Sequence, residues 1–245
     1  MARAGIGDRV EGFHAVLAAF NAGRVRVLHI ERGRLKRDDY ADLADRADRV
    51  CRVLVTDDVR SLAETTAPQG VVAECAPLVP ATLMKAVDRT DPAALIILDR
   101  LEDPRNVGAI ARSALAAGVR GMVVPTRRAA PLTSATFKAA VGALEHMDIV
   151  AVNSVADTMR QLRDRGVWLV GLDGSAEDSL FGCHLFTEPV GIVIGAEGKG
   201  LSRLVAERCD SLVSIPLSAG VESLNASVAA SLAVFELARV RGSVT

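Results

Sequence analysis

Residues 94–125 read ALIILDRLEDPRNVGAIARSALAAGVRGMVVP, and this stretch decides the fold class. The apolar run ALIILD predicts a buried strand, and the alanine-rich NVGAIARSALAAG predicts a helix that ends near Gly118. The next apolar run, GMVVP, predicts a second strand. Strands that are apolar on both faces and alternate with helices are typical of a parallel sheet covered by helices on both sides. The sequence therefore predicts an α/β fold.

The same alternation continues through the C-terminal half of the chain. Further strands are predicted at DIVAV (148–152), VWLVGLD (167–173), GIVIG (191–195) and LVSIPL (212–217). Helical patterns occupy 134–144, 155–166, 202–209 and 224–240. Ligands of parallel sheets bind where loops leave the carboxyl ends of the strands. We therefore expect the functional residues in the loops that follow Leu98, Ile194 and Leu217.

The residues before this pattern predict a second, smaller α/β domain. Helices are predicted at 12–21 and 38–49, and strands at 24–30, 51–55 and 71–75. Residues 76–93 hold three of the nine prolines and lack periodicity, which is typical of a linker. We expect a first domain at 1–75, a linker at 76–93 and a second domain at 94–245.

Composition and charge limit the function classes. The 245 residues are 50% hydrophobic but only 3% aromatic, which argues against base-stacking RNA platforms. The net charge of -1 by itself predicts an enzyme that does not bind nucleic acid. The local charge of one segment differs from this near-neutral total, because residues 24–37 hold six cationic side chains and one acidic one. Either this segment is a solvated loop or it contacts a polyanion. More arginines surround the expected site, at Arg100, Arg105, Arg112, Arg127 and Arg128.

Cysteine and histidine spacing gives no sign of a metal site or a disulfide framework. The cysteines at 51, 75, 183 and 209 form no CxxC pair, and the four histidines show no ligand spacing. The N-terminal residues contain charges and no unbroken apolar segment, and no apolar run is long enough for a membrane span. We expect a cytoplasmic protein with no membrane segment and no metal.

The first of the three loops carries Asn106 and Arg112. Asn106 lies at the predicted helix start, where its amide can cap the helix or reach a ligand. Arg112 lies in an alanine-rich helix, where an arginine that faces the sheet needs an anionic partner.

The second and third loops add glycines and small polar residues. In IGAEGKGL (194–201), the glycines let backbone approach a ligand, and Glu197 adds a carboxylate. The glycine spacing fits neither GxGxxG nor a Walker A loop, which disfavours a nicotinamide or nucleotide enzyme. In IPLSAGVESLNASVA (215–229), Ser223, Asn225 and Ser227 cluster at a predicted helix start, which favours a polar ligand there.

Together, NVGAIAR, IGAEGKGL and IPLSAGVESLNASVAA resemble the three motifs of the SpoU (TrmH-type) branch of the SPOUT RNA methyltransferases. This resemblance covers roughly 94–241. It implies a deep trefoil knot at the C-terminal end of the sheet, S-adenosylmethionine as cofactor, a homodimer, and methyl transfer to a ribose 2′-hydroxyl. The first domain, with VEGFHAV (10–16) and PQGVVA (68–73), resembles the L30e-like substrate-binding domain of the same family, although Pro68 replaces the histidine of the usual HQG.

The resemblance also implies roles for particular residues. The residues implied in catalysis are Asn106, Arg112, Glu197, Ser223 and Asn225. The residues implied in cofactor binding are Gly195, Ala196, Gly198, Ile215, Leu217, Leu224 and Ser227. Because arginine is normally protonated, we expect Arg112 to hold a phosphate and orient the hydroxyl rather than act as a base.

The resemblance leads to one main hypothesis and two alternatives. The main hypothesis is a 2′-O-ribose methyltransferase that acts on a guanosine of 23S rRNA, because the L30e-like first domain is typical of family members that modify this RNA. The first alternative is a tRNA substrate. The second is a non-catalytic RNA-binding or ribosome-assembly protein of the same fold.

Overall fold

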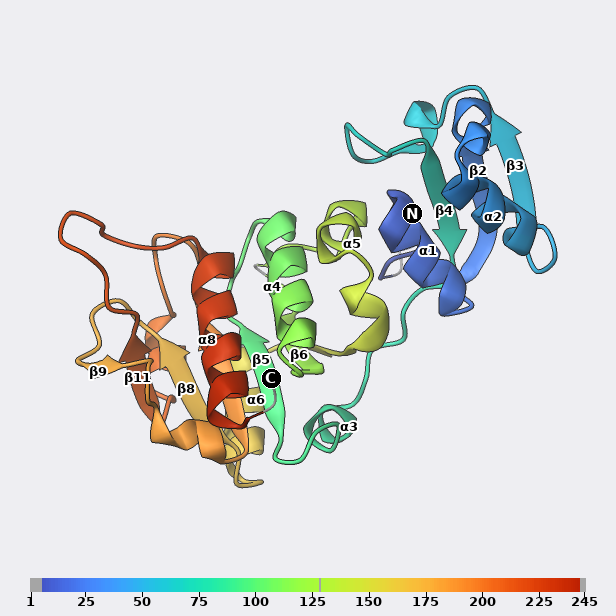
Figure 1. Ribbon diagram of the computed structural model, residues 1–245. Coiled ribbons are helices and arrows are strands. Elements are labelled where there is room, and N and C mark those ends of the chain that lie inside the picture. Colours follow the sequence, from blue (N-terminus) through green and yellow to red (C-terminus); the bar gives the residue numbers. More distant parts are fainter. Residues whose placement is uncertain (1–5, 128, 243–245) are drawn as a thin grey trace. The chain divides into compact units, whose positions relative to one another are not determined.

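The structure is a computed structural model that describes residues 6–127 and 129–242. Arg128 lies outside the described residues, as do the two ends of the chain. The chain forms two compact units. One comprises the residues up to 79 together with 132–145, and the other comprises 80–131 and 146 onward. Figure 1 shows the elements of each unit along the chain.

The N-terminal unit is built on a four-stranded sheet with the strand order β1-β4-β2-β3. Strands β2 and β3 pair in parallel, whereas β4 is antiparallel to both β1 and β2. The strands are β1 (Arg9–Glu11), β2 (Val25–Glu31), β3 (Arg52–Thr56) and β4 (Val71–Cys75). The helices are α1 (Phe13–Asn21), α2 (Asp38–Ala47), α5 (Ser134–Ala140) and the short 3₁₀ segments Arg32–Lys36, Arg60–Leu62 and Ala143–His146. Strand β1 was not predicted, because three residues carry too short a pattern.

Segment 132–145 departs from the predicted domain division, which placed it in the second domain at 94–245. In the structure it packs with the N-terminal unit. The Ser134 hydroxyl donates to Glu64 at 2.7 Å, and Glu145 forms a buried ion pair with Arg24. Both partners lie far from the segment in sequence, so no local pattern could indicate these contacts.

The second unit, hereafter the C-terminal unit, is built on a seven-stranded parallel sheet with the strand order β7-β6-β5-β10-β8-β11-β9. Its strands are β5 (Ala94–Leu98), β6 (Gly121–Pro125), β7 (Asp148–Val152), β8 (Trp168–Leu172), β9 (Asp178–Ser179), β10 (Val190–Ile194) and β11 (Ser211–Ser214). Its helices are α3 (Leu83–Val87), α4 (Pro104–Ala116), α6 (Val155–Arg163), α7 (Arg203–Ala206), α8 (Ala226–Val240) and the 3₁₀ segment His184–Thr187. The predicted parallel α/β sheet is confirmed.

The central strands of this sheet are buried along their whole length, as their apolar sequences predict. All five residues of β5 and of β10 are buried. Two predictions need correction. Strand β11 ends at Ser214, so 215–217 belong to the following loop. Helix α3 lies within 76–93, the stretch predicted as a linker, and residues 80–93 pack with the C-terminal unit.

The last helix returns to the middle of the unit. Helix α8 packs against α4, where the Ser231 hydroxyl donates to the Ser113 hydroxyl at 2.7 Å. The Arg241 guanidinium donates to the carbonyl oxygens of Pro92 (2.7 Å) and Glu188 (2.6 Å). The end of α8 is therefore tied to the segments that precede β5 and β10.

Neither a membrane helix nor a clustered metal-ligand set is found in the part of the chain that the structure describes. None of its helices is both long and apolar enough to cross a bilayer. Within the same residues, no three His, Cys, Asp or Glu side chains are grouped so that they could hold a metal ion. All four cysteines are free thiols.

Candidate functional site

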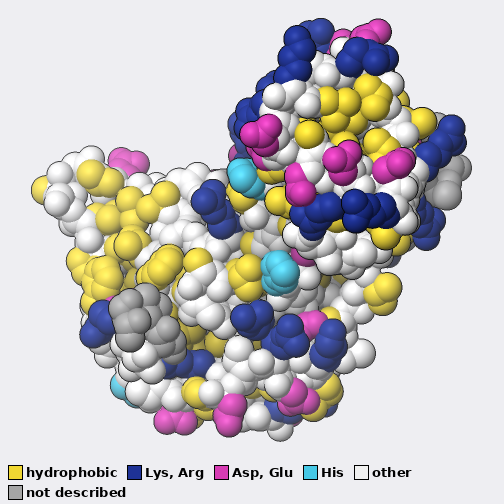
Figure 2. Space-filling view, turned by 45° about the vertical axis from the view of Figure 1, so that its right-hand side comes forward, with side chains coloured by type: hydrophobic (Ala, Val, Ile, Leu, Met, Phe, Trp, Pro, Cys, Tyr) yellow, Lys and Arg dark blue, Asp and Glu magenta, His cyan; other side chains and the backbone are white. Residues whose placement is uncertain are grey.

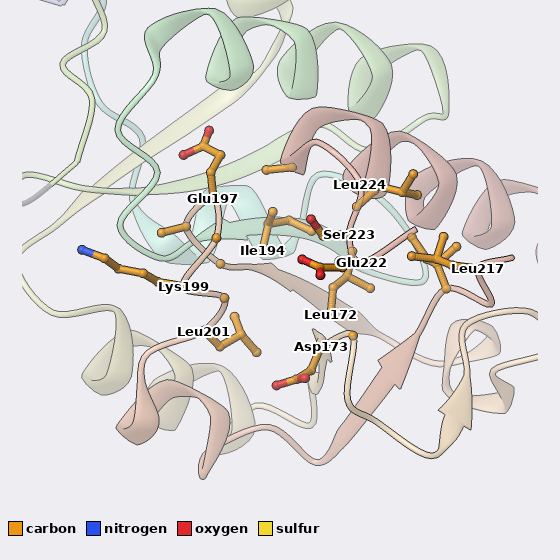
Figure 3. Close-up of a pocket in the computed structure, with 18 of the residues that line it drawn as sticks. Leu172, Asp173, Ile194, Glu197, Lys199, Leu201, Leu217, Glu222, Ser223 and Leu224 are labelled. Atoms are coloured by element: carbon orange, nitrogen blue, oxygen red, sulfur yellow. The ribbon is translucent and has the colours of Figure 1, made fainter. Parts of the chain in front are cut away.

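A pocket of about 520 Å³ lies at the carboxyl ends of β8, β10 and β11 (Figure 3). It has the size of a small-molecule site, for which ~300–1,000 Å³ is typical. Eight of the twelve residues that the sequence singled out line it, namely Gly195, Ala196, Glu197, Gly198, Ile215, Leu217, Ser223 and Leu224. The loops after β10 and β11 therefore meet where the parallel-sheet argument places a ligand.

The loop after β10, residues 195–201, owes its shape to its glycines. Ala196 and Gly200 exchange backbone hydrogen bonds of 3.0 and 2.9 Å. This tight return leaves no room beside Gly195, where an added Cβ would lie 2.2 Å from the carbonyl carbon of Gly200. Gly198 and Gly200 have φ of 71° and 62°, which disfavour other residues. We call this segment the glycine loop.

A buried carboxylate anchors the far end of the glycine loop. Asp99, directly after β5, accepts the backbone N–H of Ser202 at 2.6 Å through Oδ2. Its own N–H donates to the carbonyl of Ile194 at 2.8 Å. Asp99 thereby joins the ends of two neighbouring strands, β5 and β10, at the edge of the pocket.

Asn106 does not cap α4. The cap is Asp103, whose carboxylate accepts the N–H of Arg105 at 2.8 Å, and Asn106 is the third residue of the helix. Its amide is free to reach the glycine loop, and Nδ2 donates to Oε1 of Glu197. Figure 3 shows Glu197 and Lys199 extending from that loop. The first two motifs of the sequence are thus joined by a hydrogen bond.

Arg112 differs from the sequence expectation in its orientation. The sheet-facing side of α4 is formed by buried residues that include Ala111 and Ala114, whereas Arg112 is exposed. The interpretation that Arg112 lies inside the sheet-facing region is wrong. An exposed arginine needs no internal anion, and this side chain is available to a ligand that arrives from solvent.

Asn225 and Ser227 form the N-terminal cap of α8. The Asn225 side-chain oxygen accepts both the backbone N–H (2.8 Å) and the hydroxyl (2.6 Å) of Ser227. Neither residue lines the pocket, whereas Ser223, two residues before the cap, does. The third motif therefore places one polar side chain on the pocket wall and uses two others to begin the helix.

The sequence reasoning missed the loop after β8 and two charged residues. Leu172, Asp173 and Gly174 line the pocket, as do Lys199 and Glu222. Strand VWLVGLD ends in an aspartate as ALIILD does, so the carboxyl-edge rule could have found the first group. Hydrogen bonds from the Ser175 side chain and backbone lower the pKa of Asp173, so this carboxylate stays ionised.

The lining combines apolar walls with a negative charge excess. Aliphatic side chains come from Ile194, Leu217 and Leu224, whereas Asp173, Glu197 and Glu222 face one cation, Lys199. Figure 3 shows Glu222 on the loop that precedes α8. A ligand with a flat apolar part and positive charge fits this lining better than a phosphorylated nucleotide does.

The basic segment 24–37 belongs to the N-terminal unit, and several of its cations are paired. Arg24 is buried and binds Glu145. Arg32 pairs with Asp57 at 3.2 Å, and Arg37 pairs with Asp39 at 2.8 Å. Figure 2 shows Lys and Arg side chains interspersed with Asp and Glu on this unit. The charge excess of the sequence is therefore smaller in the fold than along the chain.

Comparisons with protein families match both units. Residues 93–235 match the SpoU rRNA methylase family, and residues 9–81 match an RNA 2′-O ribose methyltransferase substrate-binding domain. A curated relative from Photobacterium profundum, the 23S rRNA (guanosine-2′-O-)-methyltransferase RlmB, is 37% identical over 245 residues, which cover 96% of this chain and 98% of the relative.

Solved structures give the same result. The SpoU methyltransferase AviRb from Streptomyces viridochromogenes, in complex with AdoMet, matches with a TM-score of 0.79 and 28% identity over 96% of this chain and 91% of that one. A structure described as explaining 2-OH methylation of C/U34 on tRNA also has 28% identity. It covers only 62% of this chain and 97% of its own, with a TM-score of 0.54.

Proposed function

Since the chain belongs to the SpoU rRNA methylase family, we propose that it transfers a methyl group from S-adenosylmethionine to a ribose 2′-hydroxyl of RNA, at a guanosine of 23S rRNA. The observation that carries this proposal is the pocket, in which the second and third motifs meet and to whose rim the first is hydrogen bonded. The proposed products are the methylated ribose and S-adenosylhomocysteine.

The pocket fits the proposed cofactor in size and in charge. Ile194, Leu217 and Leu224 would hold the adenine, and Asp173 and Glu222 would face the positive charges of the sulfonium and amino groups. When bound, S-adenosylmethionine supplies a methyl group on a positively charged sulfur, which makes a metal unnecessary. The carboxylates hold that charge at the carboxyl edge of the sheet.

Two side chains of α4 would act on the RNA. Asn106, fixed by its hydrogen bond to Glu197, would orient the target ribose from the rim of the pocket. Arg112, exposed on the same helix, would bind the adjacent phosphate. The 2′-oxygen would form its bond to the methyl carbon as the S–CH₃ bond breaks, with the hydroxyl proton passing to solvent water and S-adenosylhomocysteine leaving. Glu197 would hold Asn106 in position, Ser223 would form part of the pocket wall, and Asn225 would fix the start of α8.

The N-terminal unit favours ribosomal RNA over tRNA as the substrate. The RlmB relative aligns across both units, and the family match at 9–81 is to a substrate-binding domain. The structure described for tRNA methylation matches only 62% of this chain. A chain that carries an additional RNA-binding unit is suited to a large, folded RNA.

Three further features belong to the same proposal. We propose a homodimer, because α8 and the loop before it expose apolar side chains at Leu217, Val221, Val228 and Phe235. We propose that the chain is threaded as a trefoil knot, supported by the return of α8 to α4. A cytoplasmic location agrees with the four free cysteines.

Mapping of ribose methylation in total RNA from cells with and without the gene tests the proposal. Loss of one 2′-O-methylguanosine from 23S rRNA, restored by the intact gene, is the expected result. Loss of a tRNA methyl group would instead support the tRNA alternative. An unchanged methylation map, together with no binding of S-adenosylmethionine in calorimetry, would favour the non-catalytic RNA-binding protein.

A further inference from the structure

Arg100 has a left-handed backbone that its local contacts do not explain. Three non-glycine residues among those described have positive φ, and they are Gln69, Arg100 and Val141. Val141 closes the C-terminal end of α5, and the backbone carbonyl of Gln69 accepts the Tyr40 hydroxyl at 2.7 Å. Arg100, with φ of 58°, makes no comparable backbone hydrogen bond to a described residue. Strain of this kind is retained chiefly at functional sites.

The guanidinium of Arg100 also lacks hydrogen-bond partners in the described part of the protein. Its Nε is buried, yet it finds no hydrogen-bond acceptor among the described residues. The nearest carboxylate oxygen, Oδ1 of Asp99, is 3.5 Å away, which is too far for a strong hydrogen bond. The other oxygen of Asp99 is occupied by the backbone N–H of Ser202. The side chain keeps 37% of its surface exposed, so a ligand can reach the donors beyond Nε.

The strand order places two other cations on either side of Arg100. Arg127 follows β6, Arg100 follows β5 and Lys199 follows β10, and these three strands are neighbours in the parallel sheet. The carboxyl ends of these three strands span about 10 Å, or two strand spacings, and each of the three residues lies in the loop that follows its strand. Arg127 and Lys199 are exposed. We call Arg100, Arg127 and Lys199 the edge cations.

One of these cations, Lys199, lines the pocket, whose three other charged side chains are carboxylates. Asp99 connects Arg100 to the glycine loop, and that loop supplies Glu197 to the pocket. A cationic cofactor and an anionic RNA backbone need adjacent sites of opposite charge, since the methyl group must pass from one to the other. Carboxylates inside the pocket and cations along its rim meet this need.

We infer that Arg100 binds a phosphate of the substrate RNA, and that Arg127 and Lys199 bind neighbouring phosphates of the same RNA strand. This inference rests on the proposed function and adds a phosphate contact separate from that of Arg112. Arg100 directly follows Asp99, which binds the end of the glycine loop through the N–H of Ser202, so the RNA backbone is bound next to the cofactor. The strained backbone of Arg100 directs its side chain to this edge.

Substitution by glycine separates this role from a structural one. Arg100→Gly removes the cation and relieves the left-handed strain, so the melting temperature should stay equal or rise. If Arg100 binds a phosphate, the Kd for 23S rRNA should rise about tenfold. The slope of log K against log salt should also fall by about 0.7 to 1, the loss of one phosphate contact.

Arg120→Gln is the matched control. Arg120 is exposed and immediately precedes β6, at the amino edge of the same sheet. This substitution removes one positive charge from the same unit. We expect the RNA affinity to fall less than twofold and the slope of log K against log salt to stay unchanged. Equal losses in both variants would overturn the inference, because they would reflect net charge alone.

Two measurements with the full chain decide the inference and the proposed function separately. Filter binding of unmodified 23S rRNA over a series of salt concentrations tests whether Arg100 binds a phosphate. An unchanged slope in Arg100→Gly overturns the inference, and so does a raised Kd for S-adenosylmethionine with unchanged RNA binding, which would assign Arg100 to the cofactor. Methyl transfer by the wild-type chain to the same RNA judges the proposed function, whatever the binding results.

Discussion

Two arginine-rich regions of this chain look alike in sequence and differ in the fold. In segment 24–37, Arg24, Arg32 and Arg37 are held by acidic side chains of the N-terminal unit. At the carboxyl edge of the parallel sheet, Arg100 makes no hydrogen bond to a described side chain, and its nearest carboxylate is 3.5 Å away. Arg112, on the following helix α4, is exposed. This difference shows that the number of cationic residues in a segment does not by itself identify an RNA-binding site. What matters is how many of them the protein has already neutralised.

The strongest test on the N-terminal side is Arg24→Met. Arg24 donates to the Gly7 carbonyl at 2.9 Å and to both carboxylate oxygens of Glu145, whose side chain is almost fully buried. Removing the guanidinium leaves that carboxylate buried without its partner, which costs about 3–5 kcal/mol of unfolding free energy. Urea unfolding followed by circular dichroism measures the loss.

The double variant Arg24→Met with Glu145→Leu is the control. It removes both charges, so we expect it to regain much of the lost stability. Retention of full stability by the single variant would show that Arg24 has no structural role, and the segment would again be a candidate RNA contact.

In helix α4, which follows β5, Arg112→Ala and Asn106→Ala should each lower kcat by at least about 100-fold, because each positions the ribose or its phosphate. Cofactor affinity by calorimetry should change little, since neither side chain lines the pocket. Arg120→Ala, which removes an exposed arginine at the opposite edge of the sheet, is the matched control. Normal turnover in both variants would remove these residues from the mechanism.

The two regions also show how far the sequence could predict the site. The carboxyl-edge rule predicted the loops after Ile194 and Leu217, which line the pocket, and the loop after Leu98, which does not. Leu224 was indicated by the family resemblance and also lines the pocket. The rule gives the place of a residue along the chain and not its rotation about a helix axis. Ala111 and Arg112 are one position apart in α4, yet the first is buried and the second exposed. Ion pairs such as Arg24 with Glu145 join residues 121 positions apart, so no local pattern reports them.

The carboxyl edge, unlike the basic segment, depends on close backbone packing. Gly195→Ala would place a Cβ 2.2 Å from the backbone of Gly200, so the glycine loop must move away from the pocket. We expect the Kd for S-adenosylmethionine to rise at least about tenfold, the equivalent of ~1.4 kcal/mol. Gly174→Ala is the control, because Gly174 also lines the pocket but an added Cβ there meets nothing within 4 Å. Equal affinities in the two variants would show that the glycine loop does not shape the cofactor site.

The smallest expected effect tests the basic segment directly. Arg37 donates to Asp39 through Nε (3.1 Å) and Nη2 (2.8 Å), and this pair raises the pKa of Arg37 and lowers that of Asp39. The double variant Arg37→Gln with Asp39→Asn removes both charges and leaves the net charge unchanged. If the pair is neutralised within the protein, the Kd for 23S rRNA should change less than twofold, and the salt slope should stay constant. A fivefold loss of affinity with a smaller salt slope would mean that Arg37 leaves Asp39 for an RNA phosphate, and the two arginine-rich regions would then share one function.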